Sequence, residues 1–385
     1  MKKSVKKIIR RIHLWLGLTS GIVVFIMAIT GAIYVFSYEI KSALHKDYEI
    51  VEVPKNQTKI SLTTLVATAT NAFDNTYTFQ NIVVPNFDNH SVSISFMETD
   101  DEAFGYWNYM KFYKTVHLNP YTGAIIHVEN TKWEFFNVML AVHMNLFLGF
   151  NPVSHVIIVW STWIFVIMLI TGIILWWPKS TEQKQKFWFR WKKTSNNKRR
   201  NYDLHQILGF YASAFALLIA LTGLMWASKS FNTSVKWIAN GGKTIGWQET
   251  PKGKETTASE KTLDVILNIT LTNIPESKYV WIRKHPKSTV PYIVRSYVSE
   301  SLNFTRIEMF YDKTTAELLA TKHFSDKNNG EKVQALNYDL HVGSIGGLPT
   351  KILALLVSLI IASLPVTGFI IWYGRGGKRK KRLLF

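Results

Sequence analysis

Four long apolar segments constrain the fold of this 385-residue chain more than any other feature of its sequence. Each is longer than the about 20 residues that an α-helix needs to cross the hydrocarbon core of a membrane. They run from Ile12 to Tyr38, Val153 to Trp177, His205 to Ser228 and Pro349 to Tyr373. The residues between them are polar and mixed in character. The sequence therefore predicts a membrane protein with four spanning helices and two large insertions, at about 41–150 and 232–345.

Basic residues gather beside the ends of these segments. Residues 1–11, 178–204 and 374–385 together carry 21 Lys and Arg and only two acids, so they account for the whole net charge of +19. The positive-inside rule predicts that these three segments lie in the cytoplasm and that both insertions lie outside. Anionic lipid and membrane topology explain this charge, and we expect no nucleic-acid partner.

The first apolar segment predicts a retained helix and not a cleaved signal peptide. It is longer than a usual signal-peptide core, and no clear small-residue cleavage site follows it. The chain also has no cysteine. Disulfides, iron–sulfur clusters, thiolate ligands and the covalent attachment of a c-type haem are therefore excluded. Any redox metal must be held without a covalent tether, with histidine as the leading ligand.

The two halves of the chain repeat each other. The runs "HLWLGLTSGIVVFIMAITGAIY", from His13, and "HQILGFYASAFALLIALTGLMW", from His205, both place a Thr-Gly pair 17 residues after the histidine. The ends of the second and fourth segments, "LITGIILWW" and "PVTGFIIWY", also match, and His143 and His341 precede these segments at equivalent places. The offsets of 192 to 198 residues predict two copies of a helix–insertion–helix unit that run in the same direction.

Each insertion has the pattern of a small antiparallel sheet that carries one helix. In the first insertion we predict a helix at 61–73, strands at 89–96, 110–118 and 124–130, and a turn at 119–123. In the second we predict a helix at 259–270, strands at 279–284, 291–297 and 318–324, and a turn at 312–317.

Several motifs resemble the PepSY-associated transmembrane family over essentially the whole chain. They are R-x-x-H-x-W-x-G at Arg10 to Gly17, the Thr-Gly-x-x-x-W helix ends, the "NPYTGAII" turn, and the run from "DLHVGSIGGLPT" to "FIIWYGR". The resemblance implies an integral α-helical four-helix bundle with two extracytoplasmic α+β PepSY-like modules. It also implies an inner-membrane haem protein, since similar members include siderophore reductases of bacterial iron uptake.

The resulting domain prediction has eight parts. It comprises a first helix with a cytoplasmic N-terminus (1–40), a first periplasmic module (41–142), an outer haem segment with the second helix (143–177), and a basic cytoplasmic loop (178–204). The third helix (205–231), a second periplasmic module (232–336), an outer haem segment with the fourth helix (337–373) and a basic cytoplasmic tail (374–385) complete it.

Five of the eleven histidines lie near membrane ends, and the predicted topology sorts four of them into pairs. His13 and His205 start helices on the cytoplasmic side, whereas His143 and His341 precede helices on the outer side. Taken singly, each could be an interfacial imidazole that water satisfies. As pairs across a bundle they match the two axial ligands of a b-type haem, one inner and one outer. His155 is an alternative ligand to His143, because it stands 16 residues before Thr171.

The surroundings of these histidines leave several alternatives open. Asp203 and Asp339, or backbone carbonyls, are candidates to orient the rings. Basic residues near the pairs could bind haem propionates or could be ordinary helix-end charges; these are Arg10, Arg11, Arg200 and Lys351. The Thr-Gly pairs fit either close helix packing or room for a porphyrin. The six histidines of the insertions are expected to have surface or packing roles, with a few able to touch a substrate: His45, His90, His117, His127, His285 and His323.

These features predict a di-haem b-type oxidoreductase of the bacterial inner membrane. By resemblance, its acceptor is a ferric siderophore or similar ferric chelate outside. The chain has no Rossmann, Walker A, G-x-S-x-G or H-E-x-x-H motif, so a quinol or a separate reductase must supply the electrons. The alternatives are a non-enzymatic PepSY-type binding or sensor protein of the membrane, and a cytochrome that donates electrons to a partner protein.

Overall fold

The computed structural model describes residues 3–178, 187–189, 191, 195–245, 251, 262–287, 289–300 and 302–381, with side chains up to residue 374. Parts of the predicted loop 178–204, of the tail 374–385 and of the predicted helix 259–270 lie outside these residues. The chain divides into two compact units. The helical unit comprises Met1–Val35, Met139–Asn232 and Leu340–Phe385, and the sheet unit comprises Phe36–Val138 and Thr233–Asp339.

Four helices of the helical unit are long and apolar enough to cross a membrane, as the sequence predicted. They are α1 (Lys3–Tyr34), α7 (Pro152–Trp176), α8 (Asn197–Ala227) and α12 (Leu348–Lys381), with the apolar span of α12 ending at Gly374. Helices α1 and α8 begin earlier than their apolar segments, because the Lys and Arg residues in front of them are good helix formers and continue the helix.

A shorter helix precedes α7 and another precedes α12. These are α6 (Phe135–Asn145) and α11 (Asn329–Val342). Asn151 caps α7 through its side chain, which accepts hydrogen bonds from the backbone N–H groups of Val153 and Ser154. The turn before α12 requires glycine at Gly343, where φ is +79° and a Cβ would lie 2.5 Å from a carbonyl oxygen of α12.

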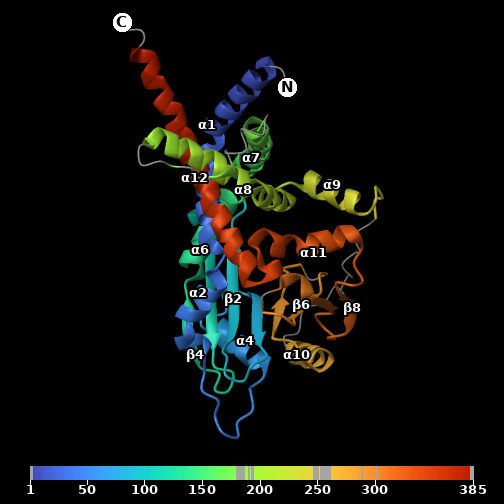
Figure 1. Ribbon diagram of the computed structural model, residues 1–385. Coiled ribbons are helices and arrows are strands. Elements are labelled where there is room, and N and C mark those ends of the chain that lie inside the picture. The colour runs from blue at the N-terminus through green and yellow to red at the C-terminus, as the bar shows by residue number, and fades with distance from the viewer. Residues whose placement is uncertain are drawn as a thin grey trace. The chain divides into compact units, whose positions relative to one another are not determined.

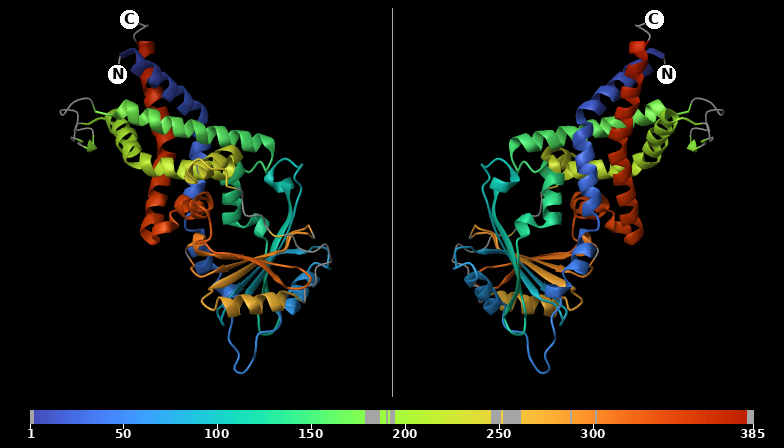
Figure 2. Two further views of the ribbon diagram at one scale, coloured as in Figure 1. Left: turned by 90° about the vertical axis from the view of Figure 1, so that its right-hand side faces the viewer. Right: turned by 90° about the vertical axis from the view of Figure 1, so that its left-hand side faces the viewer.

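The long helices pack in a ring in which α1 and α8 each contact both α7 and α12. Glycines allow close crossings, since a Cβ on Gly21 of α1 would lie 3.3 Å from Pro365 of α12. Figures 1 and 2 show α7 and α8 inclined steeply to α1 and α12. Helices that meet at small residues can cross at such angles.

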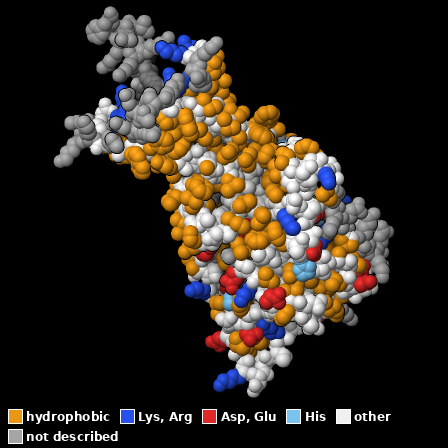
Figure 3. Space-filling model, turned by 45° about the vertical axis from the view of Figure 1, so that its right-hand side comes forward, with side chains coloured by type: hydrophobic (Ala, Val, Ile, Leu, Met, Phe, Trp, Pro, Cys, Tyr) orange, Lys and Arg blue, Asp and Glu red, His pale blue; other side chains and the backbone are white. Residues whose placement is uncertain are grey.

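Large apolar side chains cover the outer surface of these helices (Figure 3). Trp15, Ile22 and Trp160 are each more than 60% exposed. Apolar exposure of this kind is unfavourable in water but favourable in lipid, which supports a membrane environment for these helices.

The sheet unit contains one sheet of eight antiparallel strands in the order β4-β3-β2-β1-β5-β6-β7-β8 (Figure 1). The first insertion provides β1 (Phe79–Pro85), β2 (Val92–Thr99), β3 (Met110–Leu118) and β4 (Ile125–Glu129), and the second provides β5 (Tyr279–Arg283), β6 (Tyr292–Tyr297), β7 (Ile307–Tyr311) and β8 (Leu318–Lys322). The sequence predicted one sheet per insertion and named neither β1 nor β7. Strands β1 and β5 join the two halves, with Ile82 directly opposite Ile282.

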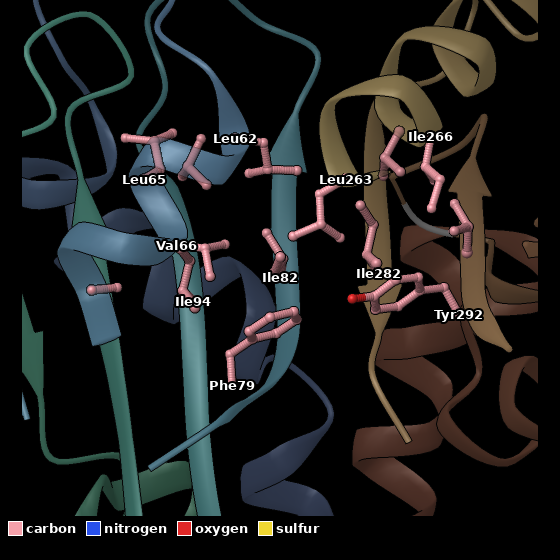
Figure 4. Close-up of a cluster of buried hydrophobic side chains, with 14 of the residues drawn as sticks. Leu62, Leu65, Val66, Phe79, Ile82, Ile94, Leu263, Ile266, Ile282 and Tyr292 are labelled. Carbon is pink, nitrogen blue, oxygen red and sulfur yellow. The ribbon is translucent and has the colours of Figure 1, made fainter. Parts of the chain in front are cut away.

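Two helices pack on one face of this sheet, α4 (Leu62–Asn71) and α10 (Thr262–Asn273), as Figure 2 shows. Their apolar side chains meet those of the strands in a single core that runs across both halves (Figure 4). The Asp264 carboxylate of α10 accepts hydrogen bonds from the backbone N–H groups of Leu62 and Thr63, which begin α4. A side chain of the second repeat therefore caps a helix of the first.

The remaining elements are short. They are α2 (Ser37–Leu44), α3 (Lys46–Glu49), α5 (Tyr106–Tyr109) and α9 (Lys229–Ala239), with 3₁₀ turns at Thr131–Trp133, Asn303–Thr305 and Ser344–Gly346.

Truncating a side chain at the joint between β1 and β5 should destabilise the sheet unit. Ile282 is fully buried, so Ile282→Ala is expected to lower the free energy of unfolding by about 2–5 kcal/mol. Ile125→Ala on the edge strand β4, where the side chain is 38% exposed, is the matched control and should cost roughly 1 kcal/mol or less. Urea unfolding of the full chain in detergent, followed by proteolysis within the sheet unit, measures both. Equal losses would contradict a core shared by the two halves.

Candidate functional site

The helical unit brings the four predicted histidines together as two opposed pairs. The ring centroids of His13 and His205 lie 6.5 Å apart with the ring planes at 86°. The ring centroids of His143 and His341 lie 6.1 Å apart with the planes at 65°. The first pair comes from α1 and α8 and the second from α6 and α11, so both pairs join equivalent places of the two repeats.

Each of these rings rests on a Thr-Gly pair of another helix. The Nδ1 atoms of His13 and His205 lie 2.9 Å from the hydroxyl oxygens of Thr171 and Thr367. Nδ1 of His341 lies 2.9 Å from the hydroxyl of Thr222.

The fourth ring is held in the same way. Nδ1 of His143 lies 3.4 Å from the hydroxyl of Thr30 and 2.8 Å from the carbonyl oxygen of Met27. Since four Thr-Gly pairs seat four imidazoles, we call each pair with its ring contact a histidine seat.

These hydrogen bonds determine which ring nitrogen carries the proton. A threonine hydroxyl has one proton, and in every seat it donates it to a backbone carbonyl of its own helix, as Thr222 does to Leu218 at 2.7 Å. The hydroxyl oxygen must then accept from the ring, so Nδ1 is the donor. The carbonyls of Met27 and Ile219, which lie 2.8 and 3.0 Å from His143 and His341, require the same tautomer. Nε2 of each neutral ring is therefore left with a free lone pair.

The glycine of each seat leaves space for the ring. A Cβ added to Gly31 would lie 3.0 Å from Cε1 of His143, and one added to Gly368 would lie 3.3 Å from Cε1 of His205. At Gly172 and Gly223 the corresponding distance to the ring is 3.4 Å. A methyl group at Gly31 or Gly368 would crowd the imidazole in its seat, whereas one at Gly172 or Gly223 would be in ordinary van der Waals contact with the ring.

A cavity of about 510 Å³ surrounds the His13 and His205 pair. This volume is within the usual range for cofactor sites, roughly 300–1,000 Å³. Its walls are mainly apolar and include three helix glycines besides those of the seats, namely Gly17, Gly21 and Gly209. Three basic side chains lie at one part of its rim, those of Lys6, Arg10 and Arg11. The cavity can therefore take a flat apolar group that carries carboxylates.

The ring separations match a metal held between two imidazoles. A metal–imidazole bond of about 2 Å on each side places the two ring centroids roughly 6 Å apart. Both observed separations are close to this value. Among the described residues, no group of three or more His, Asp or Glu side chains is arranged to hold a metal ion. A haem takes its two axial ligands from side chains and its other four from the porphyrin, and the His13 and His205 pair with its cavity fits such a group.

The His143 and His341 pair has a further aromatic neighbour. The ring of Trp226, at the end of α8, lies 5.1 Å from that of His341 at an interplanar angle of 73°. An edge-to-face contact of this kind holds the imidazole laterally while the seat holds it through Nδ1.

His155 is not brought into either pair. Its Nε2 lies 2.8 Å from the carbonyl oxygen of Ala227, so this ring has the opposite tautomer, with its proton on Nε2. The structure places His143 opposite His341.

Asp203 and Asp339, which the sequence offered as groups that orient the histidine rings, have other partners. The Asp203 carboxylate pairs with Arg199 at 2.9 Å, and the Asp339 carboxylate accepts the backbone N–H groups of Asn303 and Phe304. The paired histidine rings instead form hydrogen bonds with threonine hydroxyls and backbone carbonyls. The sequence signal for the threonines was present in the repeated Thr-Gly pairs, but spacing alone could not assign them to histidines.

The seats yield a prediction for the ring tautomers. In the chain prepared without a bound cofactor, ¹⁵N NMR of labelled histidine should show the rings of His13, His143, His205 and His341 neutral and protonated at Nδ1. His155 is the internal control and should be protonated at Nε2. Signals are assigned by their loss in single His→Gln variants. Nε2 protonation of the four paired rings would contradict the seat geometry.

Comparison with known proteins agrees with the motif resemblance. The family model described as "PepSY-associated TM region" matches residues 10–375, nearly the whole chain. No curated protein matches the chain.

Proposed function

Because the chain belongs to the PepSY-associated TM region family, we propose that it is a di-haem b-type oxidoreductase of the bacterial inner membrane. The observation that carries the proposal is that four imidazoles oppose each other as two pairs, and that Nε2 of each ring is free. In both pairs the ring centroids are separated by about the distance expected for a metal held between two imidazoles. His13 and His205 would hold the inner haem, and His143 and His341 the outer one. Two b-type haems, when bound, supply two centres that each take up and release one electron.

The chain's own residues have separate tasks in this proposal. The threonines of the seats hold each ring in the tautomer that can bind a metal, and they increase its basicity by accepting a hydrogen bond from its Nδ1–H. The apolar walls of the inner cavity exclude water, which favours electron transfer without proton leakage. Arg10 and Arg11 at the cavity rim would bind carboxylates by charge-assisted hydrogen bonds.

The positions of the pairs suit transfer across a membrane. Thr30 follows His13 by 17 residues on α1, and Thr222 follows His205 by 17 residues on α8, so the two pairs are about 26 Å apart along these helices at 1.5 Å per residue. The hydrocarbon core of a bilayer is about 30 Å thick. Electrons would enter beside the basic cytoplasmic ends and leave at the opposite face.

The donor and acceptor follow from what the sequence contains and lacks. With no nucleotide-binding fingerprint in the sequence, a quinol of the membrane or a separate reductase would supply electrons. The acceptor would be a ferric siderophore or similar ferric chelate at the periplasmic side. One electron converts its Fe(III) to Fe(II), a softer ion that hard oxygen ligands hold less tightly, so the iron is released.

The absorption spectrum tests this proposal. The purified full chain should show a Soret band whose position changes on reduction with dithionite, with two haems per chain. His13→Ala and His341→Ala should each lower the content to one haem, because each removes one ligand of a different pair. His155→Ala is the control and should retain two. Absence of a Soret band from the wild-type chain, or equal loss in the control, would reject the proposal.

A substitution in a histidine seat should act without removing a ligand. In Gly31→Ala the new methyl group would lie 3.0 Å from Cε1 of His143, so the ring must shift and the outer haem should be lost or bound at least tenfold more weakly. Gly374→Ala is the matched control, since nothing lies within 4 Å of a Cβ there. Haem titration of the two variants compares them. Retention of both haems at wild-type affinity in Gly31→Ala would show that the seat does not position the ligand.

A further inference from the structure

A second group of histidines lies in the sheet unit. His117 on β3 pairs directly across the sheet with His127 on β4. The neighbours Val116 and Leu118 belong to the core under α4 and α10, and strand side chains alternate, so His117 points to the opposite face. Tyr48 of the short helix α3 covers it there.

The rings of this cluster are close to one another. The Tyr48 ring stacks on His127 at 4.3 Å between centroids, and it lies 4.6 Å from His117 and 4.9 Å from His45. The centroids of His117 and His127 are 6.2 Å apart, similar to the separations of the two haem-ligand pairs. Three of the six histidines of the insertions therefore surround one tyrosine.

His117 is unusual because it is buried with neither ring nitrogen satisfied. The residue is 8% exposed, and both Nδ1 and Nε2 are shielded from solvent without a hydrogen-bond partner. A buried polar group without a partner costs about 1–3 kcal/mol, and in native proteins such a group is usually satisfied by water, an ion or another ligand. Burial also lowers the pKa of His117 to about 4, so the ring is neutral with a free lone pair at neutral pH.

Acidic side chains surround the cluster. Glu129 follows His127 by two residues on β4. The carboxylates of Glu129 and Glu134 both lie 3.4 Å from the ammonium of Lys41. Glu49 is half-buried, and burial is the main cause that raises the pKa of its carboxyl, with Glu129 and Asp47 contributing. Three carboxyls facing one lysine give the site a net negative charge, which favours a bound cation.

We propose that His45, His117 and His127 bind a divalent first-row transition-metal ion at this face of the sheet. Neutral imidazoles prefer such ions over Mg²⁺ and Ca²⁺, which take oxygen ligands. Tyr48 and the carboxylates supply the surrounding negative or polarisable groups. The site is independent of the proposed haem ligands and goes beyond the proposed redox function.

Binding requires a small rearrangement. Among the described side chains no three His, Asp or Glu groups already converge on one metal position. His117 is fixed by burial, whereas His127 is exposed on the edge strand and His45 is half-buried at the start of α3. To turn toward the lone pair of His117, His127 must leave its stack on Tyr48 and His45 must leave its contact with the same ring.

Zinc titration of the full chain tests the proposal. Zn²⁺ binding is measured by competition with a chromogenic chelator, using wild type, His117→Ala, His127→Ala and the control His285→Ala, another histidine of the sheet unit. Wild type and the control should bind one tight equivalent that both cluster variants lose or hold more than tenfold more weakly, the least that loss of a ligand should cost.

The exposed position of His127 provides a variant that is expected to fold. His127→Ala removes an exposed side chain and should keep the far-ultraviolet circular dichroism of the wild type even if His117→Ala does not fold. Zn²⁺ affinity equal in wild type and a folded His127→Ala would overturn the proposal, and haem content measured on the same samples keeps this result separate from the redox function.

Discussion

The hydrogen bond from each ring Nδ1–H to a threonine of a neighbouring helix is the interaction on which the rest of the helical unit depends. Without it, an imidazole among apolar helices would pay the cost of an unsatisfied polar group and could take either tautomer. With it, one nitrogen is satisfied and the other is free to bind a metal. Since the hydroxyl proton is already donated to its own helix, the threonine can only accept, and this fixes the direction of the bond in all four seats.

Because the two halves of the chain repeat each other, this arrangement occurs at two sites. Helices α1 and α8 each carry a histidine near one end and a Thr-Gly pair 17 residues further on, so each supplies a histidine to the His13 and His205 pair and a seat to the His143 and His341 pair. Helices α7 and α12 supply the seats of the first pair, and α6 and α11 supply the histidines of the second. The same relation joins the insertions, where β1 and β5 pair so that Ile82 faces Ile282. Each half alone would hold only half of each site.

Sequence patterns predicted most of this arrangement, and the failures have physical reasons. Apolar length predicted the four helices, and the offset of the repeat predicted which histidines are equivalent, so His13 with His205 could be expected before any coordinates. The role of Thr171 and Thr367 could not, because a helix–helix hydrogen bond depends on which faces meet and not on spacing along one helix. The continuous sheet was missed because β1 is half-buried and lacks clear alternation, and the pairing of β1 with β5 joins residues about 200 positions apart. The cluster around Tyr48 was missed for the same reason, since α3, β3 and β4 meet only in the folded chain.

Electron transfer through sealed vesicles tests the central claim most directly, namely that two histidine pairs connect the two faces of a membrane. Proteoliposomes holding the full chain, with a reductant enclosed and an impermeant ferric chelate outside, should form external Fe(II). Vesicles made with His13→Ala or with His341→Ala should both lose this activity, because each variant interrupts a different pair, whereas His155→Ala should keep it. External reduction that continues in either pair variant, or that is absent with a haem-loaded wild-type chain, would contradict the account.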